Sequence, residues 1–333
     1  MRVAEHMWWR QLNRSPFGYL IWLAIGSVLP LIVQDPYFRY LMVLTIIFAI
    51  LSLSLDVIVG LMGQFSFGHQ AFFGISAYTT AVLTTKLALP VWLGFGAGIF
   101  VAGLLGLIVG LIALRRTRGL YLAIITLGFG QIVWLVASNW FDLTGGLSGI
   151  ALIPSPRIGG INLNTEFEYY YFALVMLVLT AYTVELFRRS KTGRAVSAVS
   201  ENEELARSVG INPFKVYVVA FTLATTLAGL AGVTYAHFTT HVAPNSLSLY
   251  YMFWMLVMVI VGGRGTILGP IVGAFIFVFV LEWLDFAQEW KLVIFGFILL
   301  LSVLFLPAGI VPSLKTFTRR AFDGVVEWRR SRL

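Results

Sequence analysis

The chain has 333 residues, of which 59% are hydrophobic and only 11% are charged. A soluble domain carries roughly 25% charged residues, so these charges are too few to cover a surface that faces water. An apolar exterior is stable in lipid, and the composition therefore predicts a membrane protein. The chain has no cysteine, which excludes disulfides and cysteine-based metal sites. The net charge of +8 would suit nucleic acid, but the basic residues follow the membrane segments described next, so we expect no nucleic-acid partner.

Apolar windows long enough to cross a bilayer recur along the whole sequence. A hydrocarbon core of about 30 Å takes roughly 20 apolar residues in a helix. Seven windows approach or reach this length: Phe17–Val33, Tyr40–Leu61, Val91–Leu114, Leu120–Ser138, Glu168–Phe187, Val216–Ala236 and Leu292–Ile310. Three shorter runs, Ala71–Thr85, Leu249–Val261 and Gly269–Leu284, either cross fully or re-enter. The sequence therefore predicts an all-α, polytopic transmembrane helical bundle of about ten membrane segments, some of them short or broken.

Lysine and arginine residues predict the orientation of these segments. If the N-terminus is inside and all ten segments cross, the outside loops hold only Arg39, Lys86, Arg157 and Lys291. Dropping any one segment destroys this asymmetry, so both termini are expected in the cytoplasm. The expected organisation is a tail at residues 1–16, a membrane domain at 17–311 with an inside loop at 188–215, and a basic tail at 312–333. That last tail suits an amphipathic surface helix and a frayed end equally well.

Two glycine-dense stretches interrupt the apolar pattern, one at Gly60–Gln70 and one at Gly262–Pro270. Both carry the pattern Val-Gly-x-x-Gly, and the first also supplies polar side chains. Non-helical backbone survives in a membrane only where protein or a water-filled cavity satisfies it. Short, glycine-interrupted segments in both halves of a chain are typical of a transport pathway, although tight turns at the membrane surface have the same composition. The candidate pathway residues in these breaks are Gly60, Gly63, Gln64, Ser66, Gly68, His69, Gly262 and Gly265.

Few polar residues lie inside the apolar windows. Asp56 is the one carboxylate well inside a window, and it either takes part in a pathway or helix pairing, or is a structural carboxylate capped by Ser52 or Ser54. Gln131 and Thr126 either line a cavity or bond a neighbouring helix.

Spaced four apart, His237 and His241 would face one another on a helix. No third ligand is adjacent, so we expect interfacial polar residues and no metal. No catalytic motif and no phosphate-binding loop occurs, and the chain is therefore expected to be neither an enzyme nor an ATPase.

The inside loop at 188–215 contains a specified helix. Ser200-x-x-Glu203 has the spacing of a capping box, which predicts a short helix over Ser200–Val209 with acidic residues at its N-terminus. Gly210 suits the left-handed C-terminal position, and Pro213 prevents continuation. Leu205, Ala206 and Val209 form a small apolar face, which either packs on the bundle or is offered to a partner.

These residues carry a family resemblance. The pattern Glu-Leu-Ala-x-x-x-Gly-Ile at Glu204–Ile211 resembles the coupling loop of ABC importer permeases. The surrounding chain is similar to branched-chain amino acid permeases of the LivM type, through motifs within Val59–Gly74, Arg118–Leu127, Leu143–Ile150 and Gly262–Pro270. One departure is Asp56, where an uncharged Asn is usual in the family; it puts the substrate in doubt, since relatives carry urea, short amides and aromatic acids.

The resemblance implies a permease subunit in a bacterial plasma (inner) membrane, with a second related permease as partner, the same or a different chain. Two cytoplasmic ATPases would dock on it and hold the ATP and Mg, so this chain itself binds no cofactor. An extracytoplasmic binding protein would deliver a hydrophobic amino acid, which ranks first among the substrates. A stand-alone secondary transporter is disfavoured, because the chain has no relay of ionisable groups. The residues implied in ATPase coupling are Glu203, Glu204, Leu205, Ala206, Gly210 and Ile211. The outside loop Leu143–Ile150, with Thr144, Gly145 and Gly146, would lie near the gate or the binding protein.

Overall fold

The computed structural model describes residues 26–158 and 161–283, together with residues 293, 294, 296, 297, 300, 304 and 309–314. The predicted tails at 1–16 and beyond 314, and most of the windows Phe17–Val33 and Leu292–Ile310, lie outside the described residues. Within the described part the chain is helical apart from loops and four two-residue strands. The prediction of a helical bundle is confirmed, while the count of ten segments and the side on which the termini lie stay predictions.

Five helices in the described part are long and apolar enough to cross a membrane. They are α3 (Pro36–Asp56) continued by the π-helix η1 (Val57–Leu61), α5 (Val91–Ala113), α6 (Leu120–Asn139), α8 (Glu166–Arg189) and α11 (Pro213–Thr239). Three shorter helices match the short apolar runs of the sequence. They are α4 (His69–Ala81) with the π-helix η2 (Val82–Lys86), α12 (Leu249–Gly262) and α13 (Leu268–Trp283). At about 1.5 Å per residue, α12 and α13 are each shorter than a hydrocarbon core of about 30 Å.

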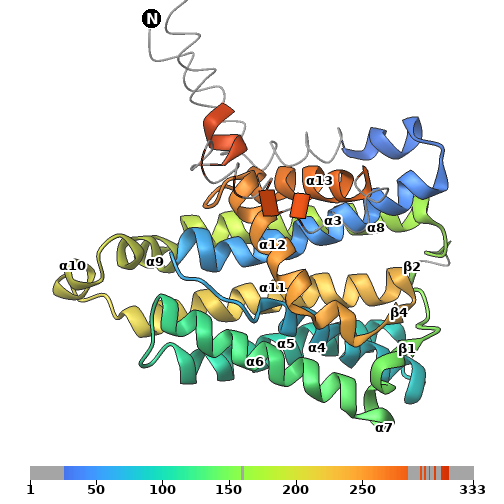
Figure 1. Ribbon diagram of the computed structural model, residues 1–333, viewed down its shortest axis with the longest axis horizontal. Coiled ribbons are helices and arrows are strands. Elements are labelled where there is room, and N and C mark those ends of the chain that lie inside the picture. The colour runs from blue at the N-terminus through green and yellow to red at the C-terminus, as the bar shows by residue number, and fades with distance from the viewer. Residues whose placement is uncertain are drawn as a thin grey trace, which may run out of the picture.

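The helices run side by side along the longest axis of the molecule (Figure 1). One end carries α9 (Lys191–Glu201) and α10 (Glu203–Ser208), and we call it the α10 end. The opposite end, the strand end, carries α7 (Phe141–Thr144), the 3-10 helices η3 (Gly146–Ser148) and η4 (Pro244–Leu247), and the strands. There β1 (Ile150–Ala151) pairs antiparallel with β4 (His241–Val242), and β2 (Arg157–Ile158) pairs with β3 (Ile161–Asn162).

Burial separates a central helix from peripheral ones. The most apolar stretch of Pro36–Leu61 is 94% buried within this chain, because α3 contacts α8, α11, α12 and α13. The corresponding stretches of α5 and α6 are only 33% and 28% buried. Their outer faces are apolar and are therefore left for lipid or for another membrane subunit.

Small residues let α5 approach α11 closely. Gly94, Gly98, Ala102, Gly106 and Gly110 recur every fourth residue and are all buried on one face of α5. A side chain added at position 106 would collide with Thr225 of α11, and one at position 98 with Val233. Such stripes are the usual way that membrane helices gain van der Waals contact, since lipid provides no hydrophobic drive between helices.

Candidate functional site

Two short helices, α9 and α10, form the α10 end. Ser190 caps α9, and its hydroxyl accepts a hydrogen bond of 3.0 Å from Gly193 N. Asn202 caps α10, and its Oδ1 accepts a hydrogen bond of 2.9 Å from Leu205 N. The predicted single helix over Ser200–Val209 is therefore wrong.

The proposed capping box fails for a local reason. Ser200 lies in the last turn of α9, where its hydroxyl donates to the carbonyl of Ser197 at 2.8 Å. Asn202 has an extended backbone and breaks the helix, so it becomes the cap, and asparagine is among the strongest N-cap residues. The acidic first turn of α10 and the left-handed Gly210, with φ of +85°, agree with the prediction. Pro213 does more than end a helix, since it occupies the first turn of α11.

The apolar face predicted for this helix is divided between two environments. Ala206 is buried against the bundle, and its carbonyl accepts a hydrogen bond of 3.0 Å from Ile211 N. Leu205 and Val209 are 64% and 70% exposed and point away from the chain. Glu204 is also exposed. Exposed aliphatic side chains on a short helix are available to a partner protein.

Glu203 fastens α10 to the rest of the bundle. Its carboxylate pairs with Arg207 one turn later at 2.6 Å and with Arg118 at 3.5 Å. Arg118 lies in the turn between α5 and α6, and its guanidinium stacks over the ring of Tyr217 in α11. Glu203 therefore links α10 to the α5–α6 turn and, through Arg118, to α11.

The two glycine breaks lie against each other. Gly60 lies in η1 and Gly265 lies in the loop between α12 and α13. A Cβ added to Gly60 would overlap Gly265 N and the carboxylate of Asp56, so position 60 has no room for a side chain. Gly265 has φ of +72°, a conformation that glycine adopts most readily. Gly262 packs in the same way on the carbonyl of Gly269. The shared Val-Gly-x-x-Gly pattern thus marks two segments in contact.

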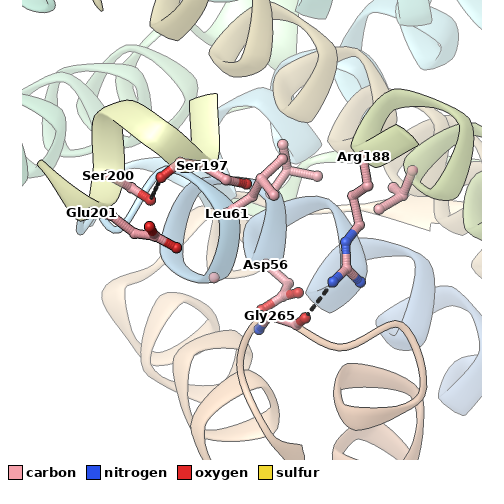
Figure 2. A pocket seen from close by; sticks show the side chains of 10 residues that line it. Asp56, Leu61, Arg188, Ser197, Ser200, Glu201 and Gly265 are labelled. Atoms are coloured by element: carbon pink, nitrogen blue, oxygen red, sulfur yellow. Dashed lines mark hydrogen bonds between the residues drawn. The ribbon is translucent and has the colours of Figure 1, made fainter. Parts of the chain in front are cut away.

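Asp56 and Arg188 both bond the backbone of Gly265, one at its N–H and the other at its carbonyl (Figure 2). The backbone N–H of Gly265 donates to Asp56 Oδ1 at 2.7 Å, and Arg188 Nη2 donates to the Gly265 carbonyl at 2.9 Å. Asp56 is only 5% exposed. We call these three residues the glycine clamp. The alternative in which Ser52 or Ser54 caps Asp56 is wrong, because Ser52 bonds the sulfur of Met258 and Ser54 bonds Leu51 O and His69.

A cavity of about 180 Å³ adjoins the glycine clamp. Its walls come from α3 with η1, the last two turns of α8, α9 and the α12–α13 loop. The residues that line it are Asp56, Val57, Gly60, Leu61, Val184, Arg188, Ser197, Ser200, Glu201 and Gly265. Ser197, Ser200 and Glu201 all belong to α9, so a displacement of α9 changes the shape of this cavity.

The rest of the first break packs on the start of α6. Gln64 Oε1 accepts a hydrogen bond of 2.5 Å from Gly119 N, and Phe67 N donates to Thr126 Oγ1 at 3.0 Å. Gly63 adopts φ of +63°, and Gly68 lies directly on the Thr126 carbonyl. Thr126 therefore bonds a neighbouring segment.

His69 anchors the start of α4 to α3 through a hydrogen bond of 2.8 Å between its Nε2 and Ser54 Oγ. Ser66 is fully buried. Gln131 is partly buried on α6, one residue beyond Gly130, whose backbone approaches Gly68.

Thr144, Gly145 and Gly146 lie at the strand end, far from the glycine clamp (Figure 1). The Thr144 hydroxyl donates to the carbonyls of Ala137 and Trp140, each at 2.7 Å. Gly145 and Gly146 have φ of +78° and +60° and fold the loop back toward β4. These three predicted pathway residues are therefore separated from those of the two glycine breaks.

The two histidines have separate structural partners at the strand end. His237 is buried, with Nε2 bonded to Thr80 Oγ1 at 2.8 Å and Nδ1 to Pro154 O at 2.7 Å. His241 lies in β4 and bonds Ser148 O at 3.0 Å. Because the helix ends at Thr239, the i, i+4 spacing does not bring the imidazoles onto one face.

Arg188 is a site residue that the sequence did not single out. In the sequence, Arg188 is one of several basic residues in the predicted inside loop. Its position at the C-terminal end of a long apolar helix, directly before α9, was the available signal. Tyr78 was hidden in a similar way, inside a short apolar run, whereas Gln70 was among the polar residues noted in the first glycine break.

The family described as "Branched-chain amino acid transport system / permease component" matches residues 37–303. The chain belongs to this family. It is 32% identical to the high-affinity branched-chain amino acid permease LivM of Escherichia coli, over 81% of this chain and 68% of that protein. It is 27% identical to LivH of Salmonella typhimurium, over 79% and 91% of the two chains.

The chain is also similar to a permease named for a different solute. The chain is 27% identical to the fructose import permease FrcC of Rhizobium meliloti, over 69% of this chain and 66% of that protein. No solved structure matches. The LivM-type resemblance seen in the sequence is confirmed, and the chain is a permease subunit of the ABC-importer class.

Proposed function

We propose that this permease carries a branched-chain or similar hydrophobic amino acid inward across the bacterial plasma membrane. The amino-acid specificity rests on the identity to LivM over most of both chains. The alternative is another small solute, such as urea, an amide or an aromatic acid, and the relation to FrcC shows that substrates differ among relatives.

The observation that carries the mechanism is the exposed pair Leu205 and Val209 on α10. In the proposed complex these two side chains insert into a groove of a cytoplasmic ATPase. The ATPases bind ATP and Mg, and this chain supplies no catalytic group. The α10 end then faces the cytoplasm, and the strand end faces the binding protein that delivers the substrate.

Motion of α10 is transmitted to the bundle through α9 and Arg188. Because α9 follows α8 directly, a shift of α9 and α10 pulls on Arg188 at the end of α8. Arg188 holds the Gly265 carbonyl, and Gly265 packs on Gly60. Closure of the ATPases thereby moves both glycine breaks together.

A second permease is the expected neighbour in the membrane. LivM and LivH are both relatives of this chain, which supports a pair of related subunits. The poorly buried outer faces of α5 and α6 supply apolar surface for that contact. The assembled importer would be a multi-pass complex of two permeases, two ATPases and one binding protein.

The test is co-purification of this chain with its ATPases after replacing both Leu205 and Val209 with Asp. Two charges in a docking groove should abolish ATPase recovery and uptake of labelled leucine. A matched control is Leu152→Asp, because Leu152 is 89% exposed but lies at the strand end. Full recovery of ATPase with the double variant would contradict the docking role of α10.

A further inference from the structure

Polar groups that lack a protein partner gather along α4. Among the residues that the structure describes, eight buried side-chain nitrogen or oxygen atoms have no hydrogen-bond partner, and five of them lie between Ser66 and Tyr78. These five are Ser66 Oγ, His69 Nδ1, both amide atoms of Gln70 and Tyr78 Oη. Unpaired buried polar groups are rare, and inside a bilayer no bulk water satisfies them. Four of these five atoms lie on α4 and the fifth lies just before it, and this concentration calls for a ligand or a water-filled path.

The unpaired groups of Gln70 and Tyr78 lie on the side of α4 that contacts α6, where the two helices run side by side (Figure 1). Gln70 is fully buried, and a Cβ added to Gly130 of α6 would come within 2.8 Å of its Nε2. Two turns further along α4, Tyr78 is only 7% exposed. We call this contact zone the α4–α6 seam.

An apolar pocket of about 290 Å³ widens the α4–α6 seam toward the strand end. Its lining residues come from α4 with η2, from α6, and from α7 and η4. Tyr78, Thr79 and Thr144 are its lining residues with hydroxyl groups, and the remaining lining is aliphatic, including Val133, Ala137 and Leu247. Pockets for drug-sized ligands measure about 300–1,000 Å³, so this pocket suits a ligand no larger than an amino acid.

We propose that the α4–α6 seam is a binding site for the transported amino acid, which rests on the function proposed above. The branched aliphatic side chain occupies the pocket, and the polar end of the molecule hydrogen-bonds the Tyr78 hydroxyl. Gln70 offers the next donor and acceptor along α4 in the direction of the glycine clamp. A lipid acyl chain would fill the pocket but would leave Tyr78 and Gln70 unpaired, so a ligand with both an apolar and a polar part fits better.

The variant Tyr78→Phe tests whether the Tyr78 hydroxyl contacts a ligand or has no partner at all. Removing a polar atom that has no partner is neutral or stabilising, whereas removing a ligand contact weakens transport. In proteoliposomes holding the whole importer, leucine uptake by Tyr78→Phe should therefore fall roughly threefold to tenfold at limiting leucine-loaded binding protein. Thermal stability should stay at the wild-type value or rise. The matched control is Tyr169→Phe, whose hydroxyl donates to Thr234 O at 2.7 Å, and which should lose stability instead.

Cysteine labelling distinguishes the amino acid from lipid. The chain has no native cysteine, so Thr79→Cys in the pocket and Val175→Cys on the exposed face of α8 are single-thiol variants. A charged, water-soluble thiosulfonate should modify Cys at position 79 at least tenfold faster than at 175, because thiolates react in water. Trapping the importer with leucine in transit should slow that reaction severalfold.

The outcomes separate the two proposals. Failure of the wild-type importer to take up leucine overturns the amino-acid function itself. Normal wild-type uptake, together with unchanged uptake by Tyr78→Phe and equal labelling at 79 and 175, overturns the seam site while the function stands. Labelling at 79 that leucine leaves unchanged also overturns it.

Discussion

Asp56 accepts a hydrogen bond of 2.7 Å from the backbone N–H of Gly265, across 209 positions of sequence. This bond joins the end of α3, the most buried of the five long helices, to the loop between the short apolar helices α12 and α13. Arg188 completes the contact from the other side of Gly265. Because Arg188 lies three residues before the first residue of α9, the same three residues connect the α10 end with both glycine breaks.

Removing the carboxylate of Asp56 should destabilise the α12–α13 loop. Asp56→Ala leaves the N–H of Gly265 unpaired, which costs about 1–3 kcal/mol of folding free energy. Asp56→Asn retains an oxygen that accepts the same bond, so it should fold and assemble. Thermal unfolding of the purified protein in detergent measures both variants, and equal midpoints for the Ala and Asn variants would contradict the role of this bond.

The contact between Gly60 and Gly265 should not tolerate a methyl group. Gly60→Ala places a Cβ inside the Gly265 backbone, and overpacking of this kind costs about 1–3 kcal/mol. Gly128 of α6 is the matched control, since nothing lies within 4 Å of a Cβ added there. Gly128→Ala should be neutral or stabilise α6 by up to about 1 kcal/mol. Comparing the thermal midpoints of the two variants tests the contact, and a similar small effect from both would exclude tight packing at Gly60.

Local chemistry explains which parts of this fold were predictable. The apolar windows, the left-handed Gly210 and the acidic start of α10 follow from periodicity, glycine geometry and the helix dipole, which need no tertiary information. The cap of α10 was missed because Ser200 and Asn202 both satisfy the local rule. The choice depends on how far α9 extends from its own cap at Ser190.

The glycine clamp could not be derived from sequence, because it joins three distant segments. The repeated Val-Gly-x-x-Gly pattern marked two of those segments as special, but it did not indicate that they touch. The unpaired hydroxyl of Tyr78 was equally hidden, since a tyrosine in an apolar run finds or lacks a partner only after packing.

The corrected cap makes a further prediction. Asn202→Ala removes the acceptor for Leu205 N and should cost about 1 kcal/mol of local helix stability. Hydrogen exchange of the amides in residues 203–208 should then speed up roughly fivefold. Ser200→Ala should leave that exchange unchanged, because its hydroxyl bonds within α9. Faster exchange in the Ser200 variant than in the Asn202 variant would contradict the Asn202 cap and support the capping box predicted from sequence.

Arg188 should govern how efficiently ATP hydrolysis is converted into transport. Arg188→Gln weakens the hold on the Gly265 carbonyl and leaves α10, with its exposed Leu205 and Val209, unchanged. The ATPases should still assemble and hydrolyse ATP, while substrate moved per ATP falls roughly threefold or more, since a charge-assisted hydrogen bond is lost.

The neighbouring Arg189 provides the control for this experiment. It is more exposed and pairs with Glu185 at 2.5 Å on the surface of α8, an interaction of the kind that contributes at most about 1 kcal/mol. Arg189→Gln should keep the wild-type ratio of uptake to hydrolysis in proteoliposomes. If both variants lose hydrolysis and uptake in proportion, Arg188 acts only through assembly. A selective drop in the ratio for Arg188→Gln places the glycine clamp between the ATPases and the membrane path, because only a residue on that route changes transport without changing hydrolysis.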